Sequence, residues 1–437
     1  MRRLILTLAS AAALTGAPVT QAVLEVPEPS GEPTVPVVRS TDDNASLEQQ
    51  RERFLKAEKA LAKLDLEAYE SLSKGLEDYP LQPYLELKHL SKRLFVATPT
   101  EIDAMMAEYG DIPLAHTLRR QWLIHLGRSG QWSTLRQVHD GTSGGDRLRC
   151  LSMRAHLKDG RHSLVMDQVP ELWKSGYSLP RACNPLLDYW REHGGLTQEL
   201  AWTRFHLAVT NGEPGLARYL RRYLDQDDRP LSRLLLDVHS NPERLRKARD
   251  FDRNDKRVGQ IVAYGMRRLV NQDPERAAEI WPFYRGRFPY EPGAVAAIEK
   301  RLALLLATRF HPEAATWLAQ ALSHGEDEAL REWQVRVALR DRNWPKVLER
   351  IGAMGRELRE KPRWQYWQAR ALDQMDRPAE AQALYETLSD RRTFYGFMAA
   401  DELGKPYSLN HQGVTMNSEA IERVQATPGV RRALELY

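Results

Sequence analysis

The stretch "NQDPERAAEIWPFY", residues 271–284, decides the fold of this chain of 437 residues. It opens with a short polar turn, Asn271-Gln272-Asp273, and proline follows at position 274. Proline fits the first turn of a helix, because the N–H that it lacks would have no partner inside the helix there. Alanines and large apolar residues then recur at helical spacing, so we expect a helix that begins at Pro274 and buries one face.

Polar turns of this kind recur along the second half of the chain. Their prolines stand at positions 214, 242, 274, 312, 345 and 378, so the intervals are 28, 32, 38, 33 and 33 residues. Each interval fits two helices joined by a tight turn, and neither helix can bury its apolar face without a neighbour. We therefore predict that residues 46–390 form an all-α superhelical solenoid, a horseshoe or ring of helix pairs that resemble tetratricopeptide repeats.

The charge of the chain does not indicate a nucleic-acid partner. The net charge is +4 and the isoelectric point is near 8.9, but the basic residues are spread along the sequence and no nucleic-acid motif is present. A solvated, arginine-rich helical surface explains this charge better than one acidic partner does.

The first residues have the layout of a secretory signal peptide. Arg2 and Arg3 precede an apolar run, residues 4–14, and Thr20-Gln21-Ala22 offers a cleavage site. The run is too short to span a bilayer, and no other stretch is apolar for eighteen residues. We expect residues 1–22 to be removed and the mature protein to lie in the periplasm without a transmembrane segment.

A proline-rich tether and a helix start are expected next. Residues 23–45 contain four prolines and few large apolar residues, which is typical of an extended linker. Ser46-Leu47-Glu48-Gln49 then has the pattern of a capping box, which predicts that the first helix begins there.

The chain has two cysteines, Cys150 and Cys183, which are 33 residues apart (183 − 150). An even number of cysteines in an exported protein permits a disulfide. Because their separation is about one repeat, the bridge would join neighbouring helix pairs. The alternative is two buried free thiols.

The sequence contains no recognisable catalytic or metal-binding constellation. None of the twelve histidines belongs to a His-Glu-x-x-His motif, and neither a Gly-x-Ser-x-Gly elbow nor a phosphate-binding loop is present. A tryptophan and tyrosine cluster falls in the last repeats (Trp333, Trp344, Trp364, Tyr366 and Trp367), where such residues are usually core. We predict no metal, no cofactor and no catalytic residue, and we assign no substrate-binding residue.

Three stretches together resemble the soluble lytic murein transglycosylases. They are "DYPLQPYLELK" (78–88), "RWQYWQARAL" (363–372) and "FYGFMAADELG" (394–404). The last stretch is similar to the start of that family's linker domain, and Gly404-Lys405-Pro406 should end its helix. Residues 391–437 would then be the beginning of the linker domain, truncated.

The resemblance implies a horseshoe of helix pairs followed by a linker and a lysozyme-like catalytic domain. That family cleaves the β-1,4 bond between N-acetylmuramic acid and N-acetylglucosamine, with one glutamic acid serving as acid and then as base. Its Glu-Ser, Gly-Leu-Met-Gln and Ala-Tyr-Asn-Ala-Gly segments are missing here. Glu70-Ser71 is the one matching dipeptide, and we interpret it as coincidence because neither later segment follows it.

Two functions follow as alternatives. In the first, the chain is the superhelical region of a periplasmic lytic transglycosylase that binds or orients peptidoglycan glycan strands without cleaving them. Other periplasmic cell-wall enzymes are its further candidate partners. In the second, it is a non-catalytic helical-repeat adaptor that binds a protein or peptidoglycan. A nucleic-acid-binding solenoid is disfavoured by the signal peptide.

Overall fold

The computed structural model describes residues 41–141, 143–413 and 417–437, and these residues contain α-helices and short 3₁₀-helices but no strand. The chain divides into two compact units, residues 1–85 and 86–437. The predicted all-α array of helix pairs is confirmed. The predicted signal peptide, residues 1–22, and most of the predicted tether lie outside the described residues.

The helices of the first half have the following bounds: α1 Thr41–Ala62, α2 Leu66–Ser73, α3 Gln82–Lys92, η1 Leu94–Val96, α4 Pro99–Tyr109, α5 Pro113–Arg128, α6 Trp132–Val138, α7 Gly145–Lys158, α8 His162–Trp173, η2 Arg181–Cys183, α9 Asn184–Glu192, α10 Gln198–Thr210, α11 Pro214–Leu220 and η3 Arg221–Tyr223. Here η denotes a 3₁₀-helix.

The helices of the second half have these bounds: α12 Asp228–Ser240, η4 Pro242–Arg246, η5 Ala248–Phe251, α13 Lys256–Gln272, α14 Pro274–Tyr284, α15 Ala294–Thr308, α16 Ala314–Leu322, α17 Glu328–Arg340, α18 Trp344–Gly352, α19 Arg356–Arg359, α20 Pro362–Asp373, α21 Pro378–Ser389, α22 Phe394–Leu403, α23 Ser418–Ala426 and α24 Pro428–Leu436.

The first unit is held by a small core of its own. Helices α1 and α2 pack together, and the core residues include Leu61, Tyr69 and Tyr79. Arg53 of α1 donates hydrogen bonds to the carbonyls of Ser71 (3.1 Å) and Leu72 (2.8 Å), at the end of α2 where carbonyls have no partner inside the helix.

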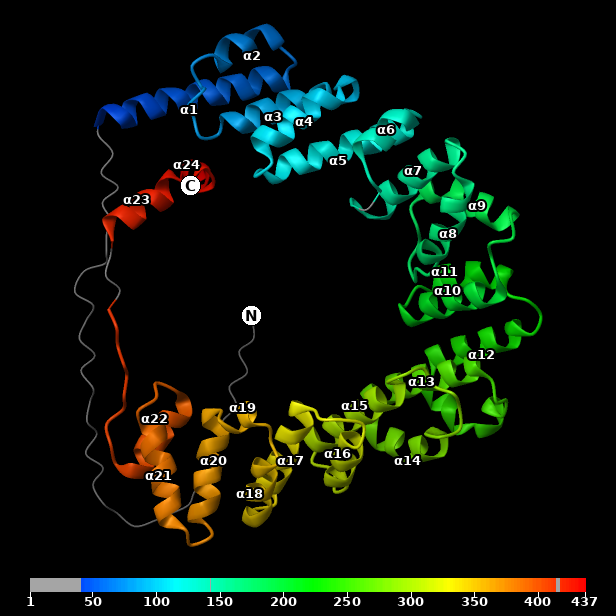
Figure 1. Ribbon diagram of the computed structural model, residues 1–437, viewed down its shortest axis with the longest axis vertical. Coiled ribbons are helices and arrows are strands. Elements are labelled where there is room, and N and C mark those ends of the chain that lie inside the picture. The colour runs from blue at the N-terminus through cyan, green and yellow to red at the C-terminus, as the bar shows by residue number, and fades with distance from the viewer. Residues whose placement is uncertain (1–40, 142, 414–416) are drawn as a thin grey trace, which may run out of the picture. The chain divides into compact units, whose positions relative to one another are not determined.

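The second unit is built from helices that contact their neighbours in the chain. Adjacent helices pair, as α13 with α14 and α20 with α21 do, and each also meets the next helix but one, as α13 meets α15. Figure 1 shows these helices following one another in sequence order. One continuous apolar core runs from Cys150 to Val337, so each face that a helix cannot cover alone is covered by its neighbours.

The predicted turns start helices by the expected mechanism. The Asp273 carboxylate accepts a hydrogen bond from Arg276 N (3.0 Å) and Pro274 follows as the first residue of α14. The Asn343 side chain likewise caps α18 by accepting from Lys346 N (3.1 Å). Each cap supplies an acceptor to an amide that has no partner inside the helix.

Three predicted helix starts differ from the structure. Pro242 opens the 3₁₀-helix η4 instead of an α-helix, and Pro312 lies in the turn before α16. The predicted capping box at Ser46 is wrong, because α1 begins at Thr41 and Ser46 lies inside it.

A buried carboxylate, Glu299 of α15, joins three helices in the second unit. It is fully buried and accepts hydrogen bonds from Trp281 Nε1 (2.8 Å) and Arg285 Nε (2.6 Å), and its other oxygen lies 2.7 Å from His324 Nε2. Burial alone would raise the pKa of Glu299, but the hydrogen bonds from Trp281 and His324 and the charge of Arg285 hold it below the usual value. We interpret Glu299 as a structural residue.

The two cysteines lie together in the core. Cys150 of α7 and Cys183 of η2 are both fully buried, and their sulfur atoms are 2.05 Å apart. The aromatic residues of the last repeats belong to the core or pack against it. Trp364 and Tyr366 are buried, Trp344 and Trp367 are half-buried in the same clusters, and Trp333 is half-buried against the long core.

Helix α22 packs on the end of the repeat array. Tyr395 and Met398 join the apolar cluster of α20 and α21, and Glu402 accepts hydrogen bonds from Tyr366 (3.0 Å) and Arg370 (3.0 Å) of α20. Gly404 follows α22 in the left-handed conformation, so the predicted helix end is confirmed. The boundary between array and linker near residue 390 stays a prediction.

No helix among the described residues is long and apolar enough to cross a membrane.

We predict that Cys150 and Cys183 form a disulfide in the exported protein. The bridge closes a separation of 33 residues, and in the chain-entropy account it stabilises the fold by about 4 kcal/mol. Thiol alkylation followed by intact-mass measurement should label no cysteine without reductant and two with it. Two labelled thiols in the unreduced protein would contradict the prediction.

We expect Glu299→Gln to destabilise the protein by about 3 kcal/mol, because it leaves Arg285 without a buried counter-charge. The carboxylate has a lowered pKa in the folded state, so its contribution is present above its ordinary value of 4.5 and is lost as pH falls through the lowered value. Urea unfolding at neutral pH and at low pH should show the difference shrinking in acid. The control is Glu275→Gln, an exposed position of α14. Equal midpoints for the two variants at neutral pH would refute the role of Glu299.

Candidate functional site

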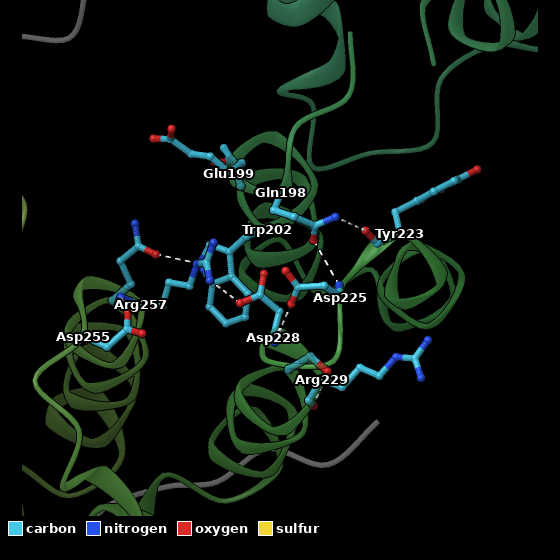
Figure 2. Close-up of polar contacts among 12 residues, drawn as sticks. Gln198, Glu199, Trp202, Tyr223, Asp225, Asp228, Arg229, Asp255 and Arg257 are labelled. Atoms are coloured by element: carbon cyan, nitrogen blue, oxygen red, sulfur yellow. Dashed lines mark hydrogen bonds and ion pairs between the residues drawn. The ribbon is translucent and has the colours of Figure 1, made fainter. Parts of the chain in front are cut away.

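The candidate site lies where η3 leads into α12, within the second unit. Its segment reads "YLRRYLDQDDRPLSR", residues 219–233, and it packs beside the start of α10 and of α13. Figure 2 shows the polar contacts that hold this junction. Among the described residues, no group of three or more His, Cys, Asp or Glu is placed to hold a metal ion.

Gln198, the first residue of α10, fixes the backbone of the junction. Its Nε2 donates to the carbonyl of Tyr223 (3.2 Å) and its Oε1 accepts from Asp225 N (3.0 Å). Figure 2 shows this side chain spanning the two backbone groups. One amide side chain therefore replaces the helix bonds that the chain gives up between η3 and α12.

Two aspartates give α12 its position. Asp225 caps the helix, because its carboxylate accepts from Asp228 N (2.9 Å). Asp228 is fully buried and pairs with Arg257 of α13. Burial raises the pKa of Asp228 and the charge of Arg257 opposes that rise. Breaking a buried pair of this kind is costly, so the pair locks α12 to α13.

Arg257 is itself held by an aromatic contact. Its guanidinium carbon lies 5.6 Å from the ring centroid of Trp202, and Trp202 Nε1 donates to Gln260 (2.8 Å). The Asp228–Arg257 pair and Trp202 thus form the inner, structural side of the junction. Figure 2 shows Arg229, the next residue along α12, extending away from this inner side.

A group of tyrosines and arginines forms what we call the tyrosine surface: Arg191, Tyr219, Arg222 and Tyr223. The hydroxyl of Tyr223 accepts from Arg191 (2.5 Å) and lies 3.1 Å from the hydroxyl of Tyr219. The guanidinium of Arg222 stacks 4.0 Å from the centroid of the Tyr219 ring, and Tyr219 is 47% exposed. Burial raises the pKa of Tyr223, and the Tyr219 hydroxyl adds to the rise, so the phenol remains a neutral hydrogen-bonding group.

The tyrosine surface rests on a buried cation. Arg204 of α10 is buried with its guanidinium carbon 4.4 Å from the centroid of Trp173, whose ring meets Tyr223 edge-on at 5.8 Å. Burial lowers the pKa of Arg204 to about 10. The side chain is still charged at neutral pH, and its attraction to the ring face helps to position the aromatic residues.

A surface pocket adjoins the tyrosine surface. Its volume is ≈ 560 Å³. We call it the arginine pocket, and its lining is Arg221, Arg222, Gln226, Arg229, Pro230 and Arg233. No acidic residue lines it. Such a pocket can bind an anion, and the tyrosines beside it can stack on a ring.

The sequence did not single out these residues. The basic residues are spread along the sequence, but four of them line one pocket because only residues 224–227 separate η3 from α12. The available signal was the pair Arg229 and Arg233, four residues apart and so on one face of a helix, just after Arg221-Arg222-Tyr223.

The residues that the sequence did single out lie elsewhere. Cys150 and Cys183 are core residues of α7 and η2. Glu70 and Ser71 lie in α2 of the first unit, where the carbonyl of Ser71 accepts a hydrogen bond from Arg53. The fully buried carboxylates of the described residues, Asp228 and Glu299, are both paired with arginine. The junction presents cations and aromatic rings at its surface, which suits binding.

Comparison with known proteins gives relatives of one kind. No protein-family profile matches the chain. It is 26% identical over 382 residues to the soluble lytic murein transglycosylase of Escherichia coli K12, and 26% identical over 371 residues to that of Salmonella typhimurium. These matches cover 86% and 83% of this chain, and 58% and 57% of the relatives.

Solved structures show the same relation. The lytic transglycosylase Slt of Pseudomonas aeruginosa, solved as an inactive mutant, matches with a TM-score of 0.75 and 32% identity, over 88% of this chain and 62% of that one. The 70-kDa soluble lytic transglycosylase of E. coli matches with a TM-score of 0.69 and 25% identity, over 89% and 63%.

The chain spans less than two thirds of the length of each of these relatives. Within that span the agreement in sequence and the agreement in helical fold cover the same large part of the chain. The chain is therefore a relative of the soluble lytic murein transglycosylases, in sequence and in fold, over more than four fifths of its length.

Proposed function

We propose that this chain binds peptidoglycan in the periplasm and holds its glycan strands on the helical array. The observation that carries the proposal is the relation to soluble lytic murein transglycosylases over 86% of the chain, combined with the shared helical fold. The same E. coli enzyme was also solved in complex with bulgecin A, with the same coverage of this chain. Proteins of this kind act on murein, so a murein-binding role suits the array.

The tyrosine surface is the part of the array best suited to a sugar chain. Tyr219 is 47% exposed, with the Arg222 guanidinium over one face of its ring, and aromatic rings with hydrogen-bonding edges recognise flat, partly polar ligands. The Tyr223 hydroxyl and the Arg191 guanidinium lie beside it as fixed polar groups. An extended ligand would contact rings through its apolar faces and guanidinium groups through its hydroxyls.

We propose further that this chain alone does not cleave the glycan. The three catalytic segments of the family do not occur in its 437 residues, and the junction carries no free carboxylic acid in its lining. Cleavage by this family's chemistry needs such an acid to protonate the leaving oxygen. The array would then supply binding and orientation only.

The purified protein should be retained by insoluble peptidoglycan and should leave it intact. We expect co-sedimentation with purified sacculi and no fall in the turbidity of a sacculus suspension. Protein that stays in the supernatant would contradict the binding proposal, and a fall in turbidity would contradict the absence of cleavage. Protein partners captured without sacculi would favour the adaptor instead.

Tyr219→Ala should weaken retention on sacculi by about threefold to tenfold, because an exposed aromatic contact contributes on the order of 1 kcal/mol. The matched control is Phe283→Ala. Phe283 is 50% exposed and also has an arginine over its ring, with Arg287 at 4.8 Å, but it lies in α14 away from the junction. Equal binding curves for the Tyr219 and Phe283 variants would contradict the proposal that the tyrosine surface binds the glycan.

A further inference from the structure

The arginine pocket contains positively charged side chains that form no ion pair within the described part of the fold. Arg221 donates to Ser232 (3.2 Å), and Arg222 donates to the carbonyl of Tyr219 (3.2 Å), so these two side chains are positioned by neutral groups. Arg229 and Arg233 form no ion pair and no side-chain hydrogen bond with any residue that the structure describes. The four guanidinium groups therefore face one pocket of ≈ 560 Å³ without a carboxylate in its lining.

The acidic side chains near the arginine pocket either have partners in the fold or lie outside the lining of the pocket. Asp228 is buried on the opposite side of α12, paired with Arg257, and the Asp225 carboxylate caps the helix by accepting from Asp228 N (2.9 Å). Asp228 is thus the one buried carboxylate of the described junction, while Asp225 and Asp227 are exposed in the turn and do not line the pocket.

The start of α12 adds to this positive potential. Arg229 falls in the first turn of a thirteen-residue helix, where the backbone dipole favours negative charge and disfavours a cation. Arg229, Arg233 on the same face and the two arginines of η3 repel one another across the pocket, and the exposed Asp225 and Asp227 offset only part of that repulsion because they lie outside its lining. An anion in the pocket would relieve this repulsion and would meet several forked donors at once.

We propose that the arginine pocket binds the free carboxylates of the peptide stems of peptidoglycan. This inference rests on the proposed function, because peptidoglycan is the anionic polymer that the chain would meet there. Its glycan backbone carries short peptides that end in carboxylates, and a pocket of this volume accommodates a ligand of that size. Arg222 belongs to both sites, so the same surface would hold a sugar on Tyr219 and the attached peptide in the pocket.

The consequence is selectivity for glycan that still carries its peptides. Arginine recognises a carboxylate by paired hydrogen bonds as well as by charge. A strand stripped of peptides would keep the contacts of the tyrosine surface and lose those of the pocket. The chain would then favour peptide-bearing regions of the wall.

The test compares sacculi with glycan strands from which an amidase has removed the peptides. Wild-type protein should bind the peptide-bearing material at least tenfold more tightly. The double variant Arg229→Glu/Arg233→Glu should lose that preference and bind both materials like the stripped strands. The control is Arg309→Glu/Arg392→Glu, two exposed arginines outside the pocket with the same change in net charge, and it should behave as wild type.

Each outcome has one meaning. Equal wild-type binding to both materials overturns this inference and leaves the proposed function standing. No wild-type binding to either material overturns the proposed function. A preference that the control variant also loses shows a general charge effect and overturns the pocket. Circular dichroism melting curves that match wild type establish that the variants are folded, as expected for exposed positions.

Discussion

The burial of each helix face by the next helix pair is the constraint on which this structure depends. A single amphipathic helix of this chain cannot bury its own apolar face. The apolar core of the second unit is therefore continuous from one helix to the next. The proline-led turns set the length of each pair, and the aspartate and asparagine caps fix where the helices start. Glu299 and the Asp228–Arg257 pair then tie neighbouring helices across the seam.

The same constraint explains where binding groups can sit. Because the apolar helix faces pack against neighbouring helices, polar side chains available for binding lie at the turns between helices. The junction of η3 and α12 is such a turn, held by Gln198 on its inner side and open on its outer side. There Asp225 and Asp228 hold α12, and four arginines and a tyrosine pair lie at the surface.

Sequence reasoning succeeded where local chemistry determines the outcome. Proline at 274 and 378 opens a helix, and Gly404 ends one, because backbone geometry leaves each residue few choices. It failed at Ser46, where a cap-like pattern lies inside a longer helix, and at Pro242, where the turn continues as a 3₁₀-helix. The resemblance in three short stretches agreed with the relatives, which match more than four fifths of the chain. The arginine pocket could not be predicted, because it depends on how η3 and α12 are placed relative to each other. The spacing of residues in the sequence does not determine that placement.

The central claim is that this helical chain binds peptidoglycan at the η3–α12 junction. Hydrogen exchange measured by mass spectrometry, with and without soluble peptide-bearing glycan fragments, tests it most directly. The account predicts slower exchange in residues 219–233 and little change in the helices that form the seam. Slower exchange confined to another part of the chain, or no change at saturating fragment, would contradict it.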